Sequence, residues 1–117
     1  MSTPVGPYTP IVRAGDWLIV SGQVGQRDRK LVDGGVAAQL RQALTNLKAL
    51  LEQEGASLTD VKKTTVFLTD INDYAAMNET YIDVMGDHRP ARSAVAVAAL
   101  PLGATVEVEA WAYIGKE

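Results

Sequence analysis

The chain of 117 residues contains no cysteine and a single histidine. Without cysteine, a disulfide, a thiolate zinc site and a cysteine nucleophile are all excluded. The lone His88 provides no metal-ligand spacing, and neither Ser21 nor Ser93 stands in the Gly-x-Ser-x-Gly turn of a serine hydrolase. The segment 22–25 lacks the third glycine and the following helix of a dinucleotide-binding loop. We therefore expect no metal site and no nucleotide cofactor.

Long apolar runs and an excess of basic residues are also missing. No run approaches the ~18 apolar residues of a membrane span, and the first residues lack the pattern of a secretory signal. Lys and Arg number 11 against 14 Asp and Glu, a net charge of −3, so the chain has no basic footprint for nucleic acid. We expect a cytoplasmic protein with no membrane contact, and we do not expect nucleic acid as a partner.

The apolar pattern predicts one domain over residues 1–117 with seven elements in the order β-β-α-β-α-β-β. We expect strands at 8–13 and 17–24, a helix at 36–54, a strand at 61–68, a helix from 69–72 to about 85, and strands at 92–99 and 105–113. Residues 25–35 are polar and rich in glycine, which predicts a loop. This order is typical of an α+β fold in which both helices cover one face of a single sheet.

The last strand predicts what the other face of that sheet carries. Apolar residues alternate there with Glu107, Glu109 and Trp111, so the second face is too mixed for plain solvent surface. This mixture indicates a subunit interface that holds a polar site. The alternation does not decide whether Arg92 or Ser93 shares that face.

Three polar residues stand in unusual places. Arg92 opens an apolar strand, where its guanidinium needs a carboxylate, either from Glu107 or Glu109 or from a ligand. Tyr8 follows Gly-Pro in a rigid turn, and Asn78 lies on the inward side of the second helix. For both of these, packing or one hydrogen bond is the simpler interpretation.

Seven short segments follow one another in an order that resembles a known family. They are 5–8 (VGPY), 20–24 (VSGQV), 66–70 (VFLTD), 78–81 (NETY), 89–93 (RPARS), and 100–101 (LP) followed by 106–110 (VEVEA). Together they resemble the reactive-intermediate deaminases, also called the RidA, YjgF or L-PSP type. The resemblance covers nearly the whole chain, and Pro-Ala-Arg-Ser is its most specific part.

The resemblance implies a chorismate-mutase-like fold and a homotrimer whose sheets face a central barrel, with clefts between subunits. It also implies hydrolysis of 2-imino or 2-enamino acids to 2-keto acids and ammonia without a cofactor. By motif position, Arg92 holds the substrate carboxylate, and Glu107 positions or protonates the attacking water and the leaving amine. Tyr8, Ser21 and Asn78 then line the cleft.

Two departures from the family pattern stand out. Ala94 occupies a position where the deaminases commonly have cysteine or a small polar residue, so only its backbone offers a polar contact to substrate. The stretch 81–90 is also shorter than in the best-known members, which alters the expected rim of the cleft. Two other functions stay open, a translation-inhibiting endoribonuclease and a non-catalytic trimer that binds small molecules. RNA cleavage usually takes a histidine or lysine acid–base pair, and here there is one histidine.

Overall fold

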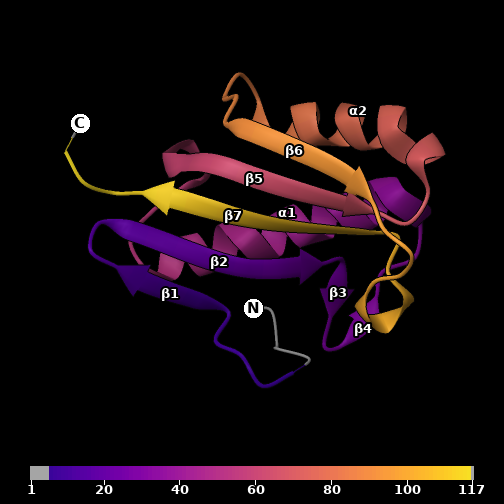
Figure 1. Cartoon of the computed structure of the whole chain (residues 1–117), viewed down its shortest axis with the longest axis horizontal. Coiled ribbons are helices and arrows are strands. Elements are labelled where there is room, and N and C mark those ends of the chain that lie inside the picture. Colours follow the sequence, from indigo (N-terminus) through magenta and orange to yellow (C-terminus); the bar gives the residue numbers. More distant parts are fainter. Residues whose placement is uncertain (1–5, 117) are drawn as a thin grey trace.

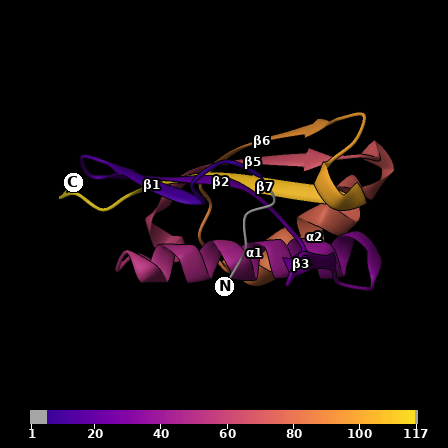
Figure 2. The same cartoon turned by 90° about the horizontal axis from the view of Figure 1, so that it is seen from below.

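The computed structural model describes residues 6–116, in which one sheet packs against two helices (Figures 1 and 2). The five strands lie in the order β1 (Ile11–Ala14), β2 (Trp17–Val24), β7 (Val106–Tyr113), β5 (Val61–Leu68) and β6 (Ala91–Ala96). All neighbours are antiparallel except β5 and β6, which run parallel. Both α1 (Gly35–Gln53) and α2 (Tyr74–Met85) lie on the same face (Figure 2). The predicted α+β class, element order and one-sided helix layer are therefore confirmed.

The core fills the space between this sheet and the helices. Helix α1 presents its predicted apolar stripe to the sheet, and strand β7 presents every second residue to the helices. The fully buried members include Leu40, Leu44, Leu47 and Leu51 of α1 and Val106, Val108, Ala110 and Ala112 of β7. Burial of each leucine or valine stabilises the fold by about 1.5–3 kcal/mol. The other residues of β7 are thereby directed to the face without helices, here called the open face.

The predicted first strand, 8–13, is wrong at its start, because pairing begins only at Ile11. Pro7 and Pro10 have no backbone N–H to donate to a ladder, and residues 6–8 bend instead. The end of the segment still lies against β2, since the backbone N–H of Ser21 donates to the carbonyl of Pro10 at 2.9 Å. Residues 1–5 and 117, including Val5 of the first resembling segment, lie outside the described residues.

The predicted loop at 25–35 contains a small hairpin of β3 (Gln26–Arg27) and β4 (Lys30–Leu31). Its two central residues, Asp28 and Arg29, have φ values of 52° and 68°. This left-handed pair is typical of a tight two-residue hairpin turn, which usually carries asparagine and glycine. Because the usual turn residues are absent, the sequence pattern did not reveal the hairpin.

The predicted second helix is preceded by a 3₁₀ turn, Ile71–Asp73, whose first backbone groups are capped by Asp70. The Asp70 carboxylate accepts a hydrogen bond from the backbone N–H of Asn72 at 2.9 Å. Helix α2 ends at Met85, close to the predicted end at about 85, and is followed by Gly86 with φ of 64°. The next strand, predicted at 92–99, ends at Ala96, where its pairing with β5 also ends. Among the described residues, no helix has both the length and the apolar character needed to span a membrane.

Candidate functional site

Strand register places the predicted site residues on two different faces of the sheet. Glu107 and Glu109 lie on the open face, opposite Phe67 and Thr65 of β5. Because directly paired residues point to the same side of a sheet, Ser93, which pairs with Thr65, shares that face. Arg92 pairs instead with Thr64, a residue fully buried beneath the helices. Arg92 therefore lies on the helix face.

This placement contradicts an internal ion pair between Arg92 and Glu107 or Glu109. The carboxylates and the guanidinium extend from opposite faces of the sheet. In the part of the chain that the structure describes, Arg92 has no carboxylate within ion-pair distance, and the ion pair found is Arg41–Asp83. No described carboxylate therefore neutralises the charge of Arg92, which leaves the guanidinium available to a ligand.

Three side chains of α2 hold the Arg92 guanidinium, and together we call them the arginine cage. Nη2 donates to the hydroxyl of Tyr74 at 3.1 Å, and Nη1 lies 3.5 Å from Sδ of Met77. The guanidinium carbon lies 5.0 Å from the ring centroid of Tyr81 and 5.7 Å from that of Tyr74. Aromatic faces attract a cation, and neutral acceptors leave its charge uncompensated. The cage thus fixes Arg92 without neutralising it.

Tyr81 differs from Tyr74 in its hydrogen bond. Its hydroxyl lies 2.7 Å from Oγ1 of buried Thr64. Burial raises the pKa of Tyr81, an effect that the Thr64 hydrogen bond and the charges of Arg92 and Arg89 only partly oppose. Tyr81 therefore remains a neutral wall of the cage.

Asn78 and Ala94 belong to the same region as Arg92. Asn78 lies one helical turn after Tyr74, and its Oδ1 is buried with no hydrogen-bond partner among the described residues. A buried acceptor without a donor is costly, so it indicates a group supplied from outside the chain. Ala94 follows Arg92 on the same face and packs its methyl group against the core. We call Arg92, Asn78 and Ala94 the arginine half-site.

Glu107 lies on the open face above an irregularity in β2. The pairing of β2 with β7 shifts register between Val20 and Gln23, which is typical of a β-bulge. A Cβ atom placed on Gly22 within this bulge would lie 2.6 Å from Cδ and Oε1 of Glu107. The missing side chain of Gly22 therefore makes the space in which the carboxylate lies.

Burial raises the pKa of Glu107, and the nearby negative charge of Glu109 raises it further. Glu107 has no hydrogen bond to another described residue that would hold its ionised form. The carboxyl group therefore stays protonated to higher pH than an ordinary glutamate, which suits it to proton transfer.

Ser21 lies next to Gly22 and so close to Glu107, and Tyr8 belongs to the segment that reaches Ser21 through Pro10. Ser21 adjoins Gly22, and its Oγ donates to the carbonyl of Pro10 at 3.1 Å. Tyr8 comes two residues before Pro10 and is 42% exposed. We call Glu107, Ser21 and Tyr8 the glutamate half-site. The six predicted site residues thus form two groups of three, which the fold of one chain keeps apart.

Sequence reasoning missed Gly22 and the arginine cage. Tyr74, Met77 and Tyr81 have the three- and four-residue spacing of a buried helix face, which by itself indicates only an apolar stripe. The usable signal was the pair of tyrosines, whose hydroxyls need partners even on an apolar face.

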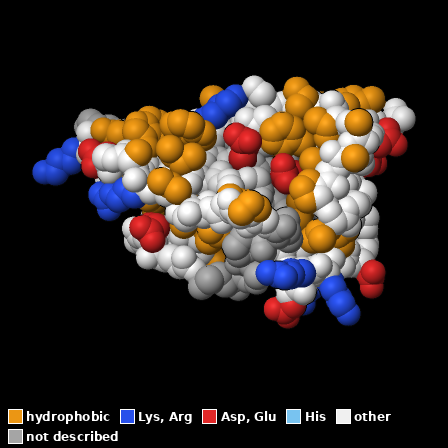
Figure 3. Space-filling model, turned by 60° about the horizontal axis from the view of Figure 1, so that its bottom comes forward, with side chains coloured by type: hydrophobic (Ala, Val, Ile, Leu, Met, Phe, Trp, Pro, Cys, Tyr) orange, Lys and Arg blue, Asp and Glu red, His pale blue; other side chains and the backbone are white. Residues whose placement is uncertain are grey.

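The open face also carries large exposed apolar side chains. Val12, Val95 and Trp111 are 47%, 44% and 42% exposed. Trp17 packs edge-on against Trp111 and Tyr113, with ring centroids 5.9 and 5.0 Å apart. Figure 3, an oblique view, shows hydrophobic side chains gathered in two areas with acidic side chains between them. Such a surface is typical of a contact with another protein chain.

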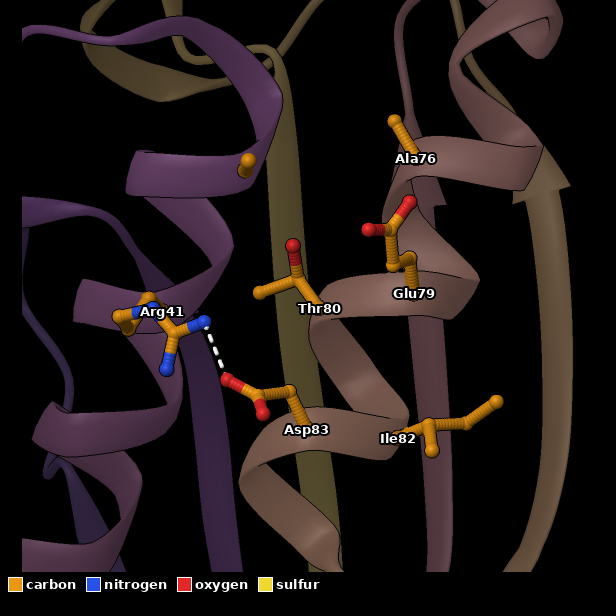
Figure 4. A pocket seen from close by; sticks show the side chains of 7 residues that line it. Arg41, Ala76, Glu79, Thr80, Ile82 and Asp83 are labelled. Carbon is orange, nitrogen blue, oxygen red and sulfur yellow. Dashed lines mark hydrogen bonds and ion pairs between the residues drawn. The ribbon is translucent and has the colours of Figure 1, made fainter.

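A separate groove of about 530 Å³ lies between α1 and α2 (Figure 4). It is lined by Ala37, Arg41, Ala76, Glu79, Thr80, Ile82 and Asp83. Arg41 and Asp83 form an ion pair of 2.6 Å across it, and both side chains are exposed, so the pair adds little stability. None of the predicted site residues lines this groove. Within residues 6–116 there is also no cluster of three His, Asp or Glu side chains able to hold a metal ion.

Comparison with known proteins relates this arrangement to a family. The family model described as endoribonuclease L-PSP matches residues 1–114. The human 2-iminobutanoate/2-iminopropanoate deaminase is 43% identical over 95% of this chain and 82% of its own. A RutC family protein of Pyrococcus horikoshii is 46% identical over 94% of this chain and 89% of its own.

Two solved structures show the same fold. The crystal structure of RidA from an Antarctic Psychrobacter species has a TM-score of 0.91 and 42% identity, covering 96% of this chain and 92% of that one. The structure of Escherichia coli TdcF with bound serine has a TM-score of 0.89 and 37% identity, covering 96% and 91%.

Proposed function

Since the chain belongs to the endoribonuclease L-PSP family, we propose that it is a deaminase that hydrolyses 2-imino acids, or their enamine tautomers, to 2-keto acids and ammonia. The observation that carries the proposal is the Arg92 guanidinium, held by the arginine cage without a carboxylate partner. A fixed guanidinium recognises a carboxylate through two parallel hydrogen bonds. The name of the human relative and the serine bound to TdcF, an amino acid with such a carboxylate, support this substrate class.

The reaction asks little of the protein beyond orientation and proton transfer. The imine carbon is electrophilic, so a water oxygen bonds to it while Glu107 takes a proton from the water and the C=N electron pair moves to nitrogen. The nitrogen of the resulting carbinolamine gains a proton from Glu107. The hydroxyl proton of the carbinolamine then passes through Glu107 to the nitrogen, the C–N bond breaks with its electron pair on the departing ammonia, and the carbonyl forms. The raised pKa of Glu107 supports this double role, and the unpartnered Oδ1 of Asn78 supports a contact with a substrate N–H.

The site that we propose is assembled from two copies of the chain. Arg92 and Glu107 point from opposite faces of one sheet, so the glutamate half-site of one copy would face the arginine half-site of the next. The resemblance implies three copies, with the open faces lining a central barrel. The exposed Trp111 and Val95 on that face support such burial.

The test measures ammonia released from imino acids that an amino-acid oxidase generates in place. We expect the protein to accelerate release above the uncatalysed rate, and Arg92→Ala to lose at least about tenfold of that acceleration. Arg41→Ala is the matched control, because it removes an exposed arginine of the α1–α2 groove. Correctly assembled protein that accelerates hydrolysis of no imino acid in a broad panel would contradict the proposal.

The description of the family favours endoribonuclease activity as a second candidate. Its chemistry lacks support in this chain, because Nε2 of the lone histidine, His88, lies 2.8 Å from the carbonyl of Val61 and is occupied there. RNA degradation that survives rigorous purification and disappears in Arg92→Ala would favour the ribonuclease. Carboxylate binding without turnover would favour a non-catalytic trimer.

A further inference from the structure

We infer that Tyr74 is a positioning and specificity-determining residue, whose hydroxyl orients Arg92 and presents an additional O–H donor to a bound carboxylate. The inference rests on the proposed function, since it concerns the same carboxylate site, but its test does not depend on turnover. It adds an O–H donor from α2 to the arginine half-site.

In the hydrogen bond between Tyr74 and Arg92, the guanidinium is the donor and the phenol oxygen is the acceptor. A guanidinium nitrogen only donates, so at 3.1 Å the phenol oxygen of Tyr74 is the acceptor. The phenol proton is then free, and Tyr74 makes no other hydrogen bond within the described residues. Its side chain is 42% exposed, so this proton is accessible from outside the chain. By contrast, the hydroxyl of Tyr81 is tied to Thr64 inside the core.

The same contact fixes the plane of the guanidinium. Tyr74 lies at one terminal nitrogen of Arg92 and Met77 at the other, while the ring of Tyr81 lies against the group. Each terminal nitrogen carries two N–H groups, so one on each remains free for a carboxylate. An arginine that is already oriented loses less rotational freedom when the ligand binds.

This arrangement also predicts which ligands the site refuses. Free N–H groups of Arg92 and the O–H of Tyr74 form a set of donors that a carboxylate satisfies with its lone pairs. A carboxamide of the same shape presents its own N–H donors to that set and leaves them unpaired. We therefore expect the site to bind 2-keto acids and to reject the corresponding amides.

The test compares wild type with Tyr74→Phe, which keeps the ring and removes only the hydroxyl. Calorimetric titration uses 2-oxobutanoate and 2-oxobutanamide as probes, and kinetics uses the matching imino acid. For Tyr74→Phe we expect an acid Kd and a KM about tenfold higher, with kcat within about twofold and an unchanged melting temperature. The control is Tyr113→Phe, a tyrosine packed on Trp17 on the open face, which should leave both constants unchanged.

Three results would overturn the inference. Tyr74→Phe could bind the acid as wild type does, it could lose acid and amide affinity in equal proportion, or the wild type could bind no 2-keto acid at all. A wild type that binds the acid and rejects the amide, yet releases no ammonia, would contradict the proposed deaminase and leave the role of Tyr74 in carboxylate binding intact.

Discussion

At the scale of the residue, Arg92 and Glu107 are two partly buried ionisable groups without an ionic partner among the described residues. Arg92 is accommodated by aromatic faces and neutral acceptors of α2. Glu107 has only the space above Gly22, and burial followed by the charge of Glu109 raises its pKa. The raised pKa of Glu107 means that its ionised form costs stability at neutral pH, as expected of a group kept for a ligand.

Glu107→Gln should distinguish the cost in stability from the role of Glu107 in proton transfer. Turnover should fall by roughly 10²–10⁴-fold, because an amide cannot accept the proton. The folded state binds the Glu107 proton more tightly than the unfolded state, whose pKa is near 4.5, so wild-type stability falls as pH rises from that value through the raised pKa. Glutamine does not titrate in this pH range. Thermal unfolding should therefore show the melting temperature of Glu107→Gln rising relative to that of wild type as pH increases.

Glu109→Gln is the matched variant on the same face of β7. Removing its charge should lower the pKa of Glu107 and shift the acid limb of the pH–rate profile to lower pH while the protein stays active. An inactive, correctly assembled Glu109→Gln beside an active Glu107→Gln would show that the two glutamates had been assigned the wrong way round.

Arg92→Ala should leave folding nearly unchanged, because no carboxylate of the described chain loses a partner. Carboxylate binding should weaken by about 1.5–3 kcal/mol, the range for a hydrogen bond to a charged group. Arg92→Lys should restore little of it, since an ammonium lacks the planar fork. Unfolding by denaturant and ligand titration measure the two effects separately, and a large loss of stability in Arg92→Ala would indicate a structural role instead.

At the scale of the element, two glycines near the end of β2 have different roles, Gly22 within the strand and Gly25 directly after its last residue. A Cβ on Gly22 would meet the mobile end of the Glu107 side chain at 2.6 Å, whereas one on Gly25 would meet the backbone of Gln39 in α1 at 2.3 Å. The first clash is relieved by moving a side chain, and the second only by moving a helix. The bulge in β2 thus makes room for the Glu107 carboxylate, and the close approach at Gly25 lets α1 pack against this segment.

Gly22→Ala and Gly25→Ala form a matched pair that tests this division. Gly22→Ala should cost less than about 1 kcal/mol of stability and reduce turnover at least about tenfold, because Glu107 is displaced. Gly25→Ala should cost about 1–3 kcal/mol or more through overpacking. Denaturant unfolding and ammonia release measure both variants, and equal stability losses would refute the distinction.

The bounds and exposed faces of some elements could be predicted from the sequence, and those of others could not. The stripe of α1 and the alternation of β7 report burial on one side, so the bounds of α1 were predicted to within a residue and the two faces of β7 correctly. The face of Arg92 could not be predicted, because β6 is short, lies at the edge and has small residues on both sides. Its orientation comes from parallel pairing with β5, a contact between distant segments.

At the scale of the whole molecule, the separation of the two half-sites predicts complementation between inactive variants. Arg92→Ala still carries a normal Glu107, and Glu107→Gln still carries a normal Arg92. When the two are unfolded together and refolded as an equal mixture, about a quarter of the sites in a cyclic assembly receive both normal residues, and activity should return to that fraction. Sedimentation should report about three times 12.5 kDa for each variant. A mixture as inactive as its components would place the whole site within one chain.

The position of Arg92 and Glu107 on opposite faces of one sheet affects how activity should depend on protein concentration. In the proposed assembly, a folded chain without another copy has one half-site on each face of its sheet and no complete site, so activity would depend on association between chains as well as on their number. Dilution lowers the rate more steeply than in proportion wherever assemblies dissociate. Because each chain of the proposed assembly contributes one half-site to the next, a variant chain would also lower the activity of its neighbours without any loss of fold.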